Sequence, residues 1–293
     1  MSIDRVLVAG AGLMGHGIAE SLALAGRHVT LYEPELARAT AGRDRIGAGL
    51  ERRVGRGAMT PDERSATLER IAATNDLAAA ADVDLVIEAV FEDVEVKTSL
   101  WSELDRWARP DTIFATNTSS ISIDRLAAAL SQERRPRFIG MHFFSPVPRM
   151  PIVEMIRGSA TSEVTERAVR ELSAAMGKEV IVSADRPGFI VNRMLMPFLG
   201  EAMRAFEQGL GTAEDIDTGA RVGLNHPMGP LELADFIGLD VCLGVMEVLY
   251  DGFGQEQFAP PSVLRSLVEA GNLGRKTGRG FHAYPPAEGA PAS

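Results

Sequence analysis

The chain has 293 residues, of which 45% are hydrophobic and 24% charged, a composition typical of a soluble globular protein and a length sufficient for two domains. Its formal net charge of -10 argues against nucleic acid as the main partner, although a local basic patch could still bind a small anionic ligand. The single cysteine, Cys242, excludes an intrachain disulfide and a thiolate metal cage, and no segment resembles a signal peptide or a membrane span, so we expect a cytoplasmic protein with no metal and no membrane partner.

Short apolar runs alternate with amphipathic helical stretches through the first part of the chain. These runs are rich in Val, Ile and Phe without strict alternation, which is typical of parallel strands buried on both faces. They occupy residues 5–10, 28–33, 83–90, 112–117, 137–144 and 178–183. The repetition of strand and helix predicts an α/β fold with a Rossmann-type doubly wound sheet. A charged helical insertion is expected at 35–70, between the second and third of these strands.

The pattern changes near Asp185. Only helical patterns follow it, beginning with "RMLMPFLGEAMRAFEQG". We therefore expect a Rossmann-type domain over 1–184 and an all-helical domain over 185–284, in which Cys242 is a buried small apolar residue. The Pro- and Ala-rich segment 285–293 is expected to be a disordered tail.

The segment "VAGAGLMG" joins the first predicted strand to the first predicted helix. There Gly10 permits a tight turn, Gly12 lets the backbone approach a pyrophosphate, and Gly15 lets the helix pack against the strand. The helix N-terminus offers N–H groups and a partial positive charge to phosphate. Glu33, at the end of the second strand, would bond a ribose diol and repel a 2′-phosphate, which favours NAD over NADP. The alternative is a glycine-rich turn in a sheet that binds no nucleotide. The expected cofactor-binding residues of this loop are Gly10, Ala11, Gly12, Leu13, Met14 and Gly15.

Five further motifs follow one another along the chain. In order they are "ATNTSSISI", "GMHFFSPVPRMPIVEMI", "RPGFIVNRMLMPFLGEAM", "HPMGPLELADFIGLD" and "LGRKTGRGF". Together they resemble the L-3-hydroxyacyl-CoA dehydrogenase family, including the bacterial 3-hydroxybutyryl-CoA dehydrogenases, from Val6 to about Tyr284. The resemblance implies an NAD-binding domain followed by a helical domain that forms much of a dimer interface.

His142 and Glu154 are the expected acid–base pair. Oxidation of a secondary alcohol needs a base for the hydroxyl proton, and imidazole suits this because histidine titrates near neutral pH. His142 falls at the C-terminal end of a predicted strand, the edge where doubly wound folds bind ligands. Glu154 is an acid in an otherwise apolar strand, so it needs a partner if it is buried. A turn near Pro146 to Pro148 would make the two strands antiparallel and bring Glu154 to the imidazole. The resemblance implies the catalytic roles, and the alternative for His142 is a hydrogen-bonded structural histidine.

The resemblance assigns Ser119 and Asn192 to hydrogen bonds with substrate oxygens and places Ser119 close to the nicotinamide. Ser119 follows a predicted strand, so its hydroxyl can face the ligand-binding edge, but it could instead be a helix N-cap. Asn192 begins the first helix of the second domain, and its alternative is a plain helix-start residue.

Further cofactor contacts are implied by the resemblance alone. Glu92 and Lys97 match family residues near the cofactor, with a solvated helix face as the alternative. Lys276 matches another contact, although a basic loop would be unremarkable there. Ser145 replaces the asparagine of the usual "HFFNP" and keeps a shorter hydrogen-bonding group.

Arg52, Arg53 and Arg56 cluster in the helical insertion, where the resembled family binds CoA. A guanidinium suits the CoA phosphates, and Arg52 and Arg56 are the expected contacts. Arg56 falls where a lysine is usual, and Gly49 where a serine can occur. These departures leave the acyl chain open.

We therefore expect an NAD-dependent enzyme that oxidises an L-3-hydroxyacyl-CoA to the 3-oxoacyl-CoA and catalyses the reverse reaction, and that dimerises through its C-terminal helical domain. One alternative is a dehydrogenase of another 3-hydroxy acid, of the gulonate or carnitine type, on the same fold. A second alternative is a non-catalytic NAD-binding structural or sensor protein. Four other histidines are interpreted as structural or surface residues: His16, His28, His226 and His282.

Overall fold

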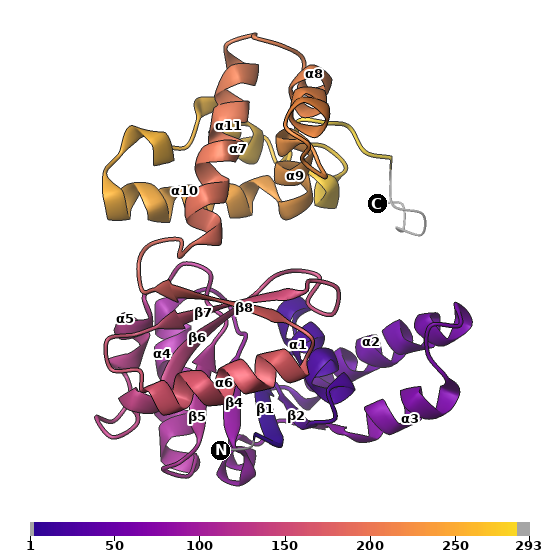
Figure 1. The fold of residues 1–293 in the computed structure, drawn as a ribbon, viewed down its shortest axis with the longest axis vertical. Helices are drawn as coiled ribbons and strands as arrows, with labels where there is room; N and C mark the ends of the chain where they lie inside the picture. The colour runs from indigo at the N-terminus through magenta and orange to yellow at the C-terminus, as the bar shows by residue number, and fades with distance from the viewer. Residues whose placement is uncertain (1–2, 286–293) are drawn as a thin grey trace. The chain divides into compact units, whose positions relative to one another are not determined.

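The computed structural model describes residues 3–285 and divides into two compact units, Met1–Arg186 and Pro187–Ser293 (Figure 1). The division lies two residues beyond the boundary expected after residue 184. Of the tail expected to be disordered, every residue except Pro285 lies outside the described residues.

The first unit is built on one eight-stranded sheet in the order β3-β2-β1-β4-β5-β6-β7-β8. Neighbouring strands are parallel except β6 and β7, which are antiparallel. The strands are β1 (Arg5–Ala9), β2 (His28–Tyr32), β3 (Ile71–Thr74), β4 (Leu85–Glu88), β5 (Ile113–Thr116), β6 (Phe138–Phe143), β7 (Ile152–Arg157) and β8 (Glu179–Ala184). Strand order reverses between β1 and β4, and this is the switch point at which such sheets bind ligands.

Helices cover both faces of this sheet. Figure 1 shows α1, α4 and α6 packed around the sheet. On one face α1 and α6 share a buried core with β1 and β4–β7, and on the other Trp101 of α4 stacks on Phe114 of β5 at 5.0 Å between ring centroids. The helical segments of the unit are α1 (Leu13–Leu24), α2 (Leu36–Gly55), α3 (Pro61–Glu69), η1 (Leu77–Asp82), α4 (Val94–Trp107), α5 (Ile123–Ala127), η2 (Arg135–Arg137) and α6 (Glu163–Ala175). Because both faces are covered, the apolar strands lack strict alternation, and the expected doubly wound fold is confirmed.

The expected helical insertion at 35–70 is corrected in two respects. It is a hairpin of two helices, α2 and α3, which break at a turn around Gly57 (Figure 1). It is followed by β3, an edge strand that the sequence analysis did not identify, so the run at 83–90 contains the fourth strand and not the third. The sequence of β3, "IAAT", is short and alanine-rich, and it lacks the β-branched run that indicates a buried strand.

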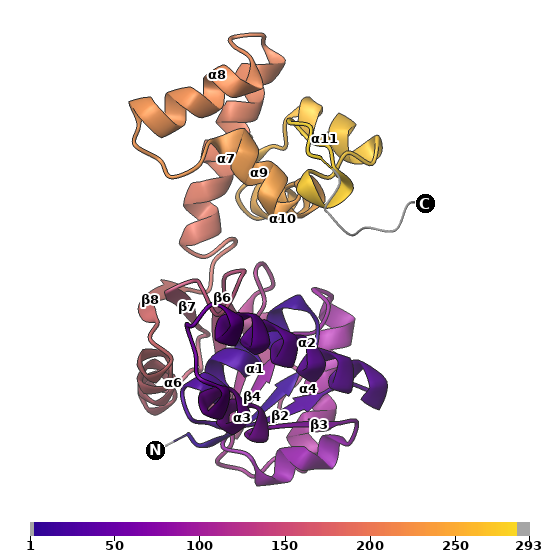
Figure 2. The same cartoon turned by 90° about the vertical axis from the view of Figure 1, so that its right-hand side faces the viewer.

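The second unit is helical, as expected. Helix α7 packs against α9, α10 and α11 (Figure 2). Its elements are α7 (Val191–Glu207), α8 (Ala213–Thr218), the π-helix η3 (Gly219–Gly223), α9 (Pro230–Ile237), α10 (Leu239–Phe253), η4 (Glu256–Phe258), α11 (Ser262–Glu269) and η5 (Arg275–Thr277). Cys242 is buried in this core, and burial raises the pKa of its thiol to about 12. Within residues 3–285, no helix combines the length and apolarity that crossing a bilayer requires.

Candidate functional site

The glycine loop after β1 has the geometry that a dinucleotide needs. Gly10 has φ +105°, and a Cβ there would lie 2.5 Å from the Ala89 carbonyl oxygen, so only glycine fits. A Cβ on Gly15 would overlap the Gly10 carbonyl oxygen, at 1.7 Å, because the first turn of α1 packs directly on the loop. A Cβ on Gly12 would meet nothing within 4 Å, and no side chain caps the helix there. The first N–H groups of α1 therefore face space that a phosphate can enter.

Glu33 fixes the other side of this loop. Its Oε1 accepts a hydrogen bond from the Ala11 amide at 2.6 Å, and Arg45 of α2 donates to the Ala11 carbonyl at 2.7 Å. The carboxylate at the end of β2 is thus held beside the glycines, where it can accept from a ribose diol. These residues fit NAD. Arg45 was not identified from the sequence, because its contact depends on how α2 folds back on the loop.

His142 and Glu154 lie directly opposite each other across the antiparallel β6–β7 pair. The His142 Nδ1 atom is 3.0 Å from Glu154 Oε2, and both residues are buried. Because an ionised carboxylate can only accept, Nδ1 donates to it, and Nε2 becomes the ring nitrogen that can take up or release a proton. The arrangement anticipated from the turn near Pro146 is therefore present.

Two polar side chains hold the ends of these strands in place. Asn117, just after β5, accepts a hydrogen bond from the Phe143 amide at 2.9 Å through its Oδ1 atom. Lys178, just before β8, donates from Nζ to the carbonyls of Val147 and Met150 at 2.8 and 2.9 Å, and burial lowers its pKa. Both contacts anchor the turn that follows His142. Neither residue was singled out from the sequence, where each looks like an ordinary polar residue at a strand end.

Ser119 lies in the loop between β5 and α5, and Glu92 holds that loop. Glu92 Oε1 accepts from the Thr118 hydroxyl at 2.5 Å and from the amides of Ser119 and Ser120 at 2.8 and 3.0 Å. The N-cap of α5 is Ser122, so the alternative N-cap role for Ser119 does not apply to this helix.

Lys97 links Glu92 to a second carboxylate. Its Nζ atom lies 2.5 Å from Oε1 of Glu88 and 3.3 Å from Oε2 of Glu92, and its side chain is only 1% exposed. The alternative of a solvated helix face is therefore wrong for Lys97. Burial raises the pKa of Glu92, but the positive charge of Lys97 and the hydrogen bonds from the Ser119 loop outweigh it, so the pKa is lowered and Glu92 is ionised at neutral pH.

Other expected site residues lie on separate elements. Ser145 is exposed in the turn after β6. Asn192 is buried in the first turn of α7 in the second unit. Lys276, also in the second unit, forms an ion pair with Asp240 at 2.5 Å. The cofactor and substrate roles of these three residues stay predictions.

The arginine cluster lies at the C-terminal end of α2. Arg52 and Arg53 occupy its last turn and Arg56 follows it. Arg53 approaches Glu20 at 3.8 Å, which leaves the exposed Arg52 and Arg56 on the surface. A Cβ on Gly49 would come no closer than 3.8 Å to Glu20, so the backbone would accept the serine that the family can carry there.

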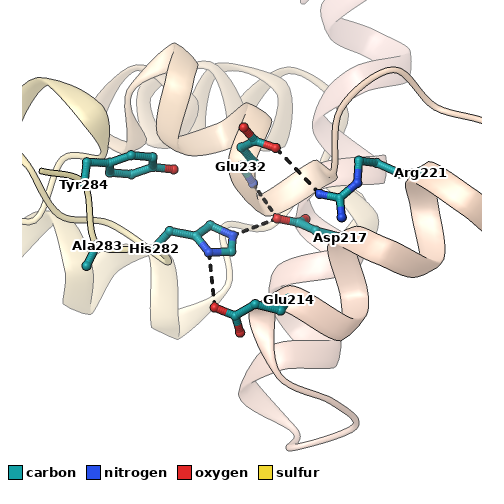
Figure 3. Close-up of a pocket in the computed structure, with 7 residues that line it drawn as sticks. All are labelled: Glu214, Asp217, Arg221, Glu232, His282, Ala283 and Tyr284. Atoms are coloured by element: carbon teal, nitrogen blue, oxygen red, sulfur yellow. Dashed lines mark hydrogen bonds and ion pairs between the residues drawn. The ribbon is translucent and has the colours of Figure 1, made fainter.

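Of the histidines interpreted as structural, His282 has the most elaborate surroundings. Its ring lies between Asp217, 2.7 Å from Nε2, and Glu214, 3.6 Å from Nδ1, in a pocket of the second unit that is also lined by Arg221, Glu232, Ala283 and Tyr284 (Figure 3). Asp217 also accepts from the amides of Leu231 and Glu232 at the start of α9. His282 therefore fastens the C-terminal segment to α8 and α9. His16 bonds to the Gly12 carbonyl, His28 approaches Asp4, and His226 stacks on Phe198.

Two family matches account for nearly the whole chain. Residues 5–186 match the family described as 3-hydroxyacyl-CoA dehydrogenase, NAD binding domain, and residues 188–284 match 3-hydroxyacyl-CoA dehydrogenase, C-terminal domain. The first match confirms NAD as the cofactor.

Individual proteins are similar over the same span. A 3-hydroxybutyryl-CoA dehydrogenase of Bradyrhizobium diazoefficiens is 48% identical over 289 residues, which cover 99% of this chain and 98% of that protein. The crystal structure of Mycobacterium tuberculosis FadB2 matches with a TM-score of 0.94 at 46% identity, and covers 97% of this chain and 100% of that one. That of (S)-3-hydroxybutyryl-CoA dehydrogenase PaaH1 from Ralstonia eutropha matches with a TM-score of 0.93 at 43% identity and the same coverage.

Two glycines of the loop are expected to respond differently to alanine. Gly15→Ala should lower the free energy of unfolding by about 2 kcal/mol or more, because the new Cβ overlaps the Gly10 carbonyl. Gly12→Ala should change it by less than about 1 kcal/mol. It should nevertheless weaken NADH binding about tenfold, because the methyl group occupies the space that the pyrophosphate approaches. Urea unfolding and NADH fluorescence titration measure the two effects. Unchanged NADH affinity in Gly12→Ala would contradict this placement of the pyrophosphate.

Proposed function

The chain belongs to the 3-hydroxyacyl-CoA dehydrogenase family, and on that premise we propose that it interconverts L-3-hydroxybutyryl-CoA and acetoacetyl-CoA with NAD, using His142 and Glu154 as its acid–base pair. The short acyl chain is inferred from the names of the similar proteins. The observation that carries the proposal is the hydrogen bond between His142 Nδ1 and the fully buried Glu154 carboxylate at the ligand-binding end of β6.

His142 is the residue to which we assign the proton transfer. In the oxidation direction its Nε2 atom takes the proton of the 3-hydroxyl group, and in reduction the imidazolium returns it to the developing alkoxide. When bound, the nicotinamide supplies the acceptor or donor for the hydride at C3. Glu154 accepts the hydrogen bond from Nδ1–H and so holds His142 in the tautomer whose Nε2 is free to accept a proton. Its negative charge also stabilises the imidazolium, which a neutral acceptor would do less well.

Other residues bind and orient. We assign Ser119 and Asn192 to hydrogen bonds with the substrate oxygens, and the fixed backbone around Ser119 supports the first assignment. Arg52 and Arg56 are assigned to the CoA phosphates because both are exposed at the end of α2. Glu92, Lys97, Ser145 and Lys276 are assigned to the cofactor side of the site.

The protein is further proposed to act in the cytoplasm as a homodimer formed through its helical unit. Large apolar side chains on this unit are exposed, among them Leu210 at 81%, Val222 at 78% and Leu224 at 64%, and a second copy would cover such residues. Sedimentation equilibrium should give twice the chain mass of 31.4 kDa, and Val222→Asp should shift the protein towards monomer. A single-chain mass for the unmutated protein at micromolar concentration would contradict the dimer.

The substrate class can be tested by following NADH oxidation with a panel of ketones. We expect rapid turnover of acetoacetyl-CoA and turnover at least about 10²-fold slower with free acetoacetate, because the free acid lacks the CoA handle that orients the reacting carbon. A carnitine-derived ketone and oxidised gulonate complete the panel. Turnover of a free acid alone would keep the acid–base pair and reject the CoA assignment, and NADH binding without any turnover would favour the sensor alternative.

If Glu154 acts through its negative charge, replacing it with glutamine, which has nearly the same shape but no charge, should lower kcat. Glu154→Gln should lower kcat by about 10²-fold, because an amide can hold the wrong tautomer of His142 and cannot stabilise the imidazolium. NADH affinity should stay unchanged, since Glu154 lies away from the glycine loop on β7. Glu166→Gln is the matched control, because Glu166 on α6 pairs with Arg157 of the same strand. Equal kcat values in the two variants would reject the proposed role.

A further inference from the structure

We propose that Glu88 is a positioning residue for the dehydrogenase reaction: through Lys97 and Glu92 it fixes the loop that carries Ser119. The inference rests on the proposed role of Ser119 in binding the substrate oxygen. Glu88 touches neither ligand in this assignment, and it acts through the two residues that follow it in the chain of contacts.

Glu88 is held rigidly in the sheet. It is the last residue of β4 and is fully buried. One carboxylate oxygen accepts from the Val90 amide at 2.8 Å and from Lys97, and the other accepts from the Thr116 hydroxyl at 2.6 Å. A buried carboxylate with partners just after its own strand, on β5 and on α4 has one available position, so it can serve as a fixed reference point.

Lys97 connects the fixed carboxylate of Glu88 to Glu92, which lies nearer the surface. Its buried ammonium lies between Glu88 and Glu92, and the side-chain exposure rises from 0% at Glu88 to 1% at Lys97 and 34% at Glu92. The chain of charges therefore runs from the sheet core to the surface at the carboxyl ends of β4 and β5. Anchoring α4 to the sheet would need only the Glu88–Lys97 pair. The extension to Glu92 adds a hold on the Ser119 loop.

Glu92 is the contact that meets the loop. Its Oε1 atom collects donors from Thr118, Ser119 and Ser120, including the Ser119 amide at 2.8 Å and its hydroxyl at 3.3 Å. The other oxygen of this carboxylate, Oε2, lies 3.3 Å from Lys97 Nζ, so the ammonium helps to orient the group that holds the loop. Without the fixed negative charge of Glu88, the ammonium would turn fully to Glu92 and pull it from the loop.

The test compares variants that disturb contacts near the two ends of α4, at Lys97 close to its N-terminus and at Asp105 close to its C-terminus. Glu88→Gln removes the charge at the sheet end, and Thr116→Val removes one of the Glu88 hydrogen bonds without altering any charge. Asp105→Asn is the matched control, since Asp105 lies on α4 too and pairs with the buried Arg134 at 2.8 Å, away from the Ser119 loop. Melting temperature, NADH affinity, kcat and KM for acetoacetyl-CoA, and hydrogen exchange of residues 117–122 are measured for each.

Glu88→Gln should lower kcat/KM by about 10- to 100-fold, because a displacement of about 1 Å in a positioning group has effects of that size, and Thr116→Val should lower it by a smaller factor. NADH affinity should fall by a smaller factor than kcat/KM, since the glycine loop and Glu33 are untouched and only Lys97 and Glu92, on the cofactor side, are disturbed. Amides 117–122 should exchange faster in both variants. Asp105→Asn should lose melting temperature as Glu88→Gln does, with wild-type kinetics and wild-type exchange in this loop.

Three results would overturn the inference: wild-type kcat/KM in a folded Glu88→Gln protein, unchanged exchange of residues 117–122, or equal kinetic losses in Asp105→Asn. If Glu88→Gln does not fold, wild-type kinetics and exchange in Thr116→Val would overturn it. Failure of the proposed function is separable. In that case the unmutated protein would not reduce acetoacetyl-CoA, while the exchange measurement would still decide whether Glu88 holds the loop.

Discussion

The antiparallel register of β6 and β7 is the constraint on which the site depends. Side chains alternate between the faces of a strand, so a slip of one residue would send Glu154 to the opposite face from His142. The register is maintained from outside the pair, where Lys178 binds the connecting turn and Asn117 binds the end of β6. The one antiparallel contact in a sheet of otherwise parallel strands thus supplies an acid and a base at a single point.

Three pairs of the first unit set a buried side chain against one of opposite charge. Glu154 is paired with His142, Glu88 with Lys97, and Arg134 with Asp105. An unpaired ion at these depths would cost several kcal/mol, so each pair fixes the elements that carry it. The buried carboxylates Glu88 and Glu154 therefore orient the side chains with which they pair. The arginines assigned to CoA, in contrast, are exposed at the end of α2.

The fold class and the acid–base pair can be predicted from the sequence because both are encoded in short contiguous segments. Apolar runs mark the buried strands, and a proline-containing turn between two of them predicts that His142 will face Glu154. Edge strand β3 has no comparable signal, since "IAAT" is only four residues long and half of it is alanine. Glu88 carries the same signal as Glu154, an acid within an apolar strand. Its partner could not be inferred, because Lys97 is turned inward by the packing of α4, which sequence spacing does not determine.

The central claim is that His142 moves the proton during hydride transfer. The most direct measurement mixes His142→Gln, present in excess over its bound NADH, with saturating acetoacetyl-CoA, so that each NADH reacts once, and follows this single turnover by NADH absorbance. The account predicts full NADH binding and a transfer rate lower by at least about 10²-fold, the usual contribution of a general acid. A single-turnover rate equal to that of the unmutated protein would contradict it and would assign the proton to another group.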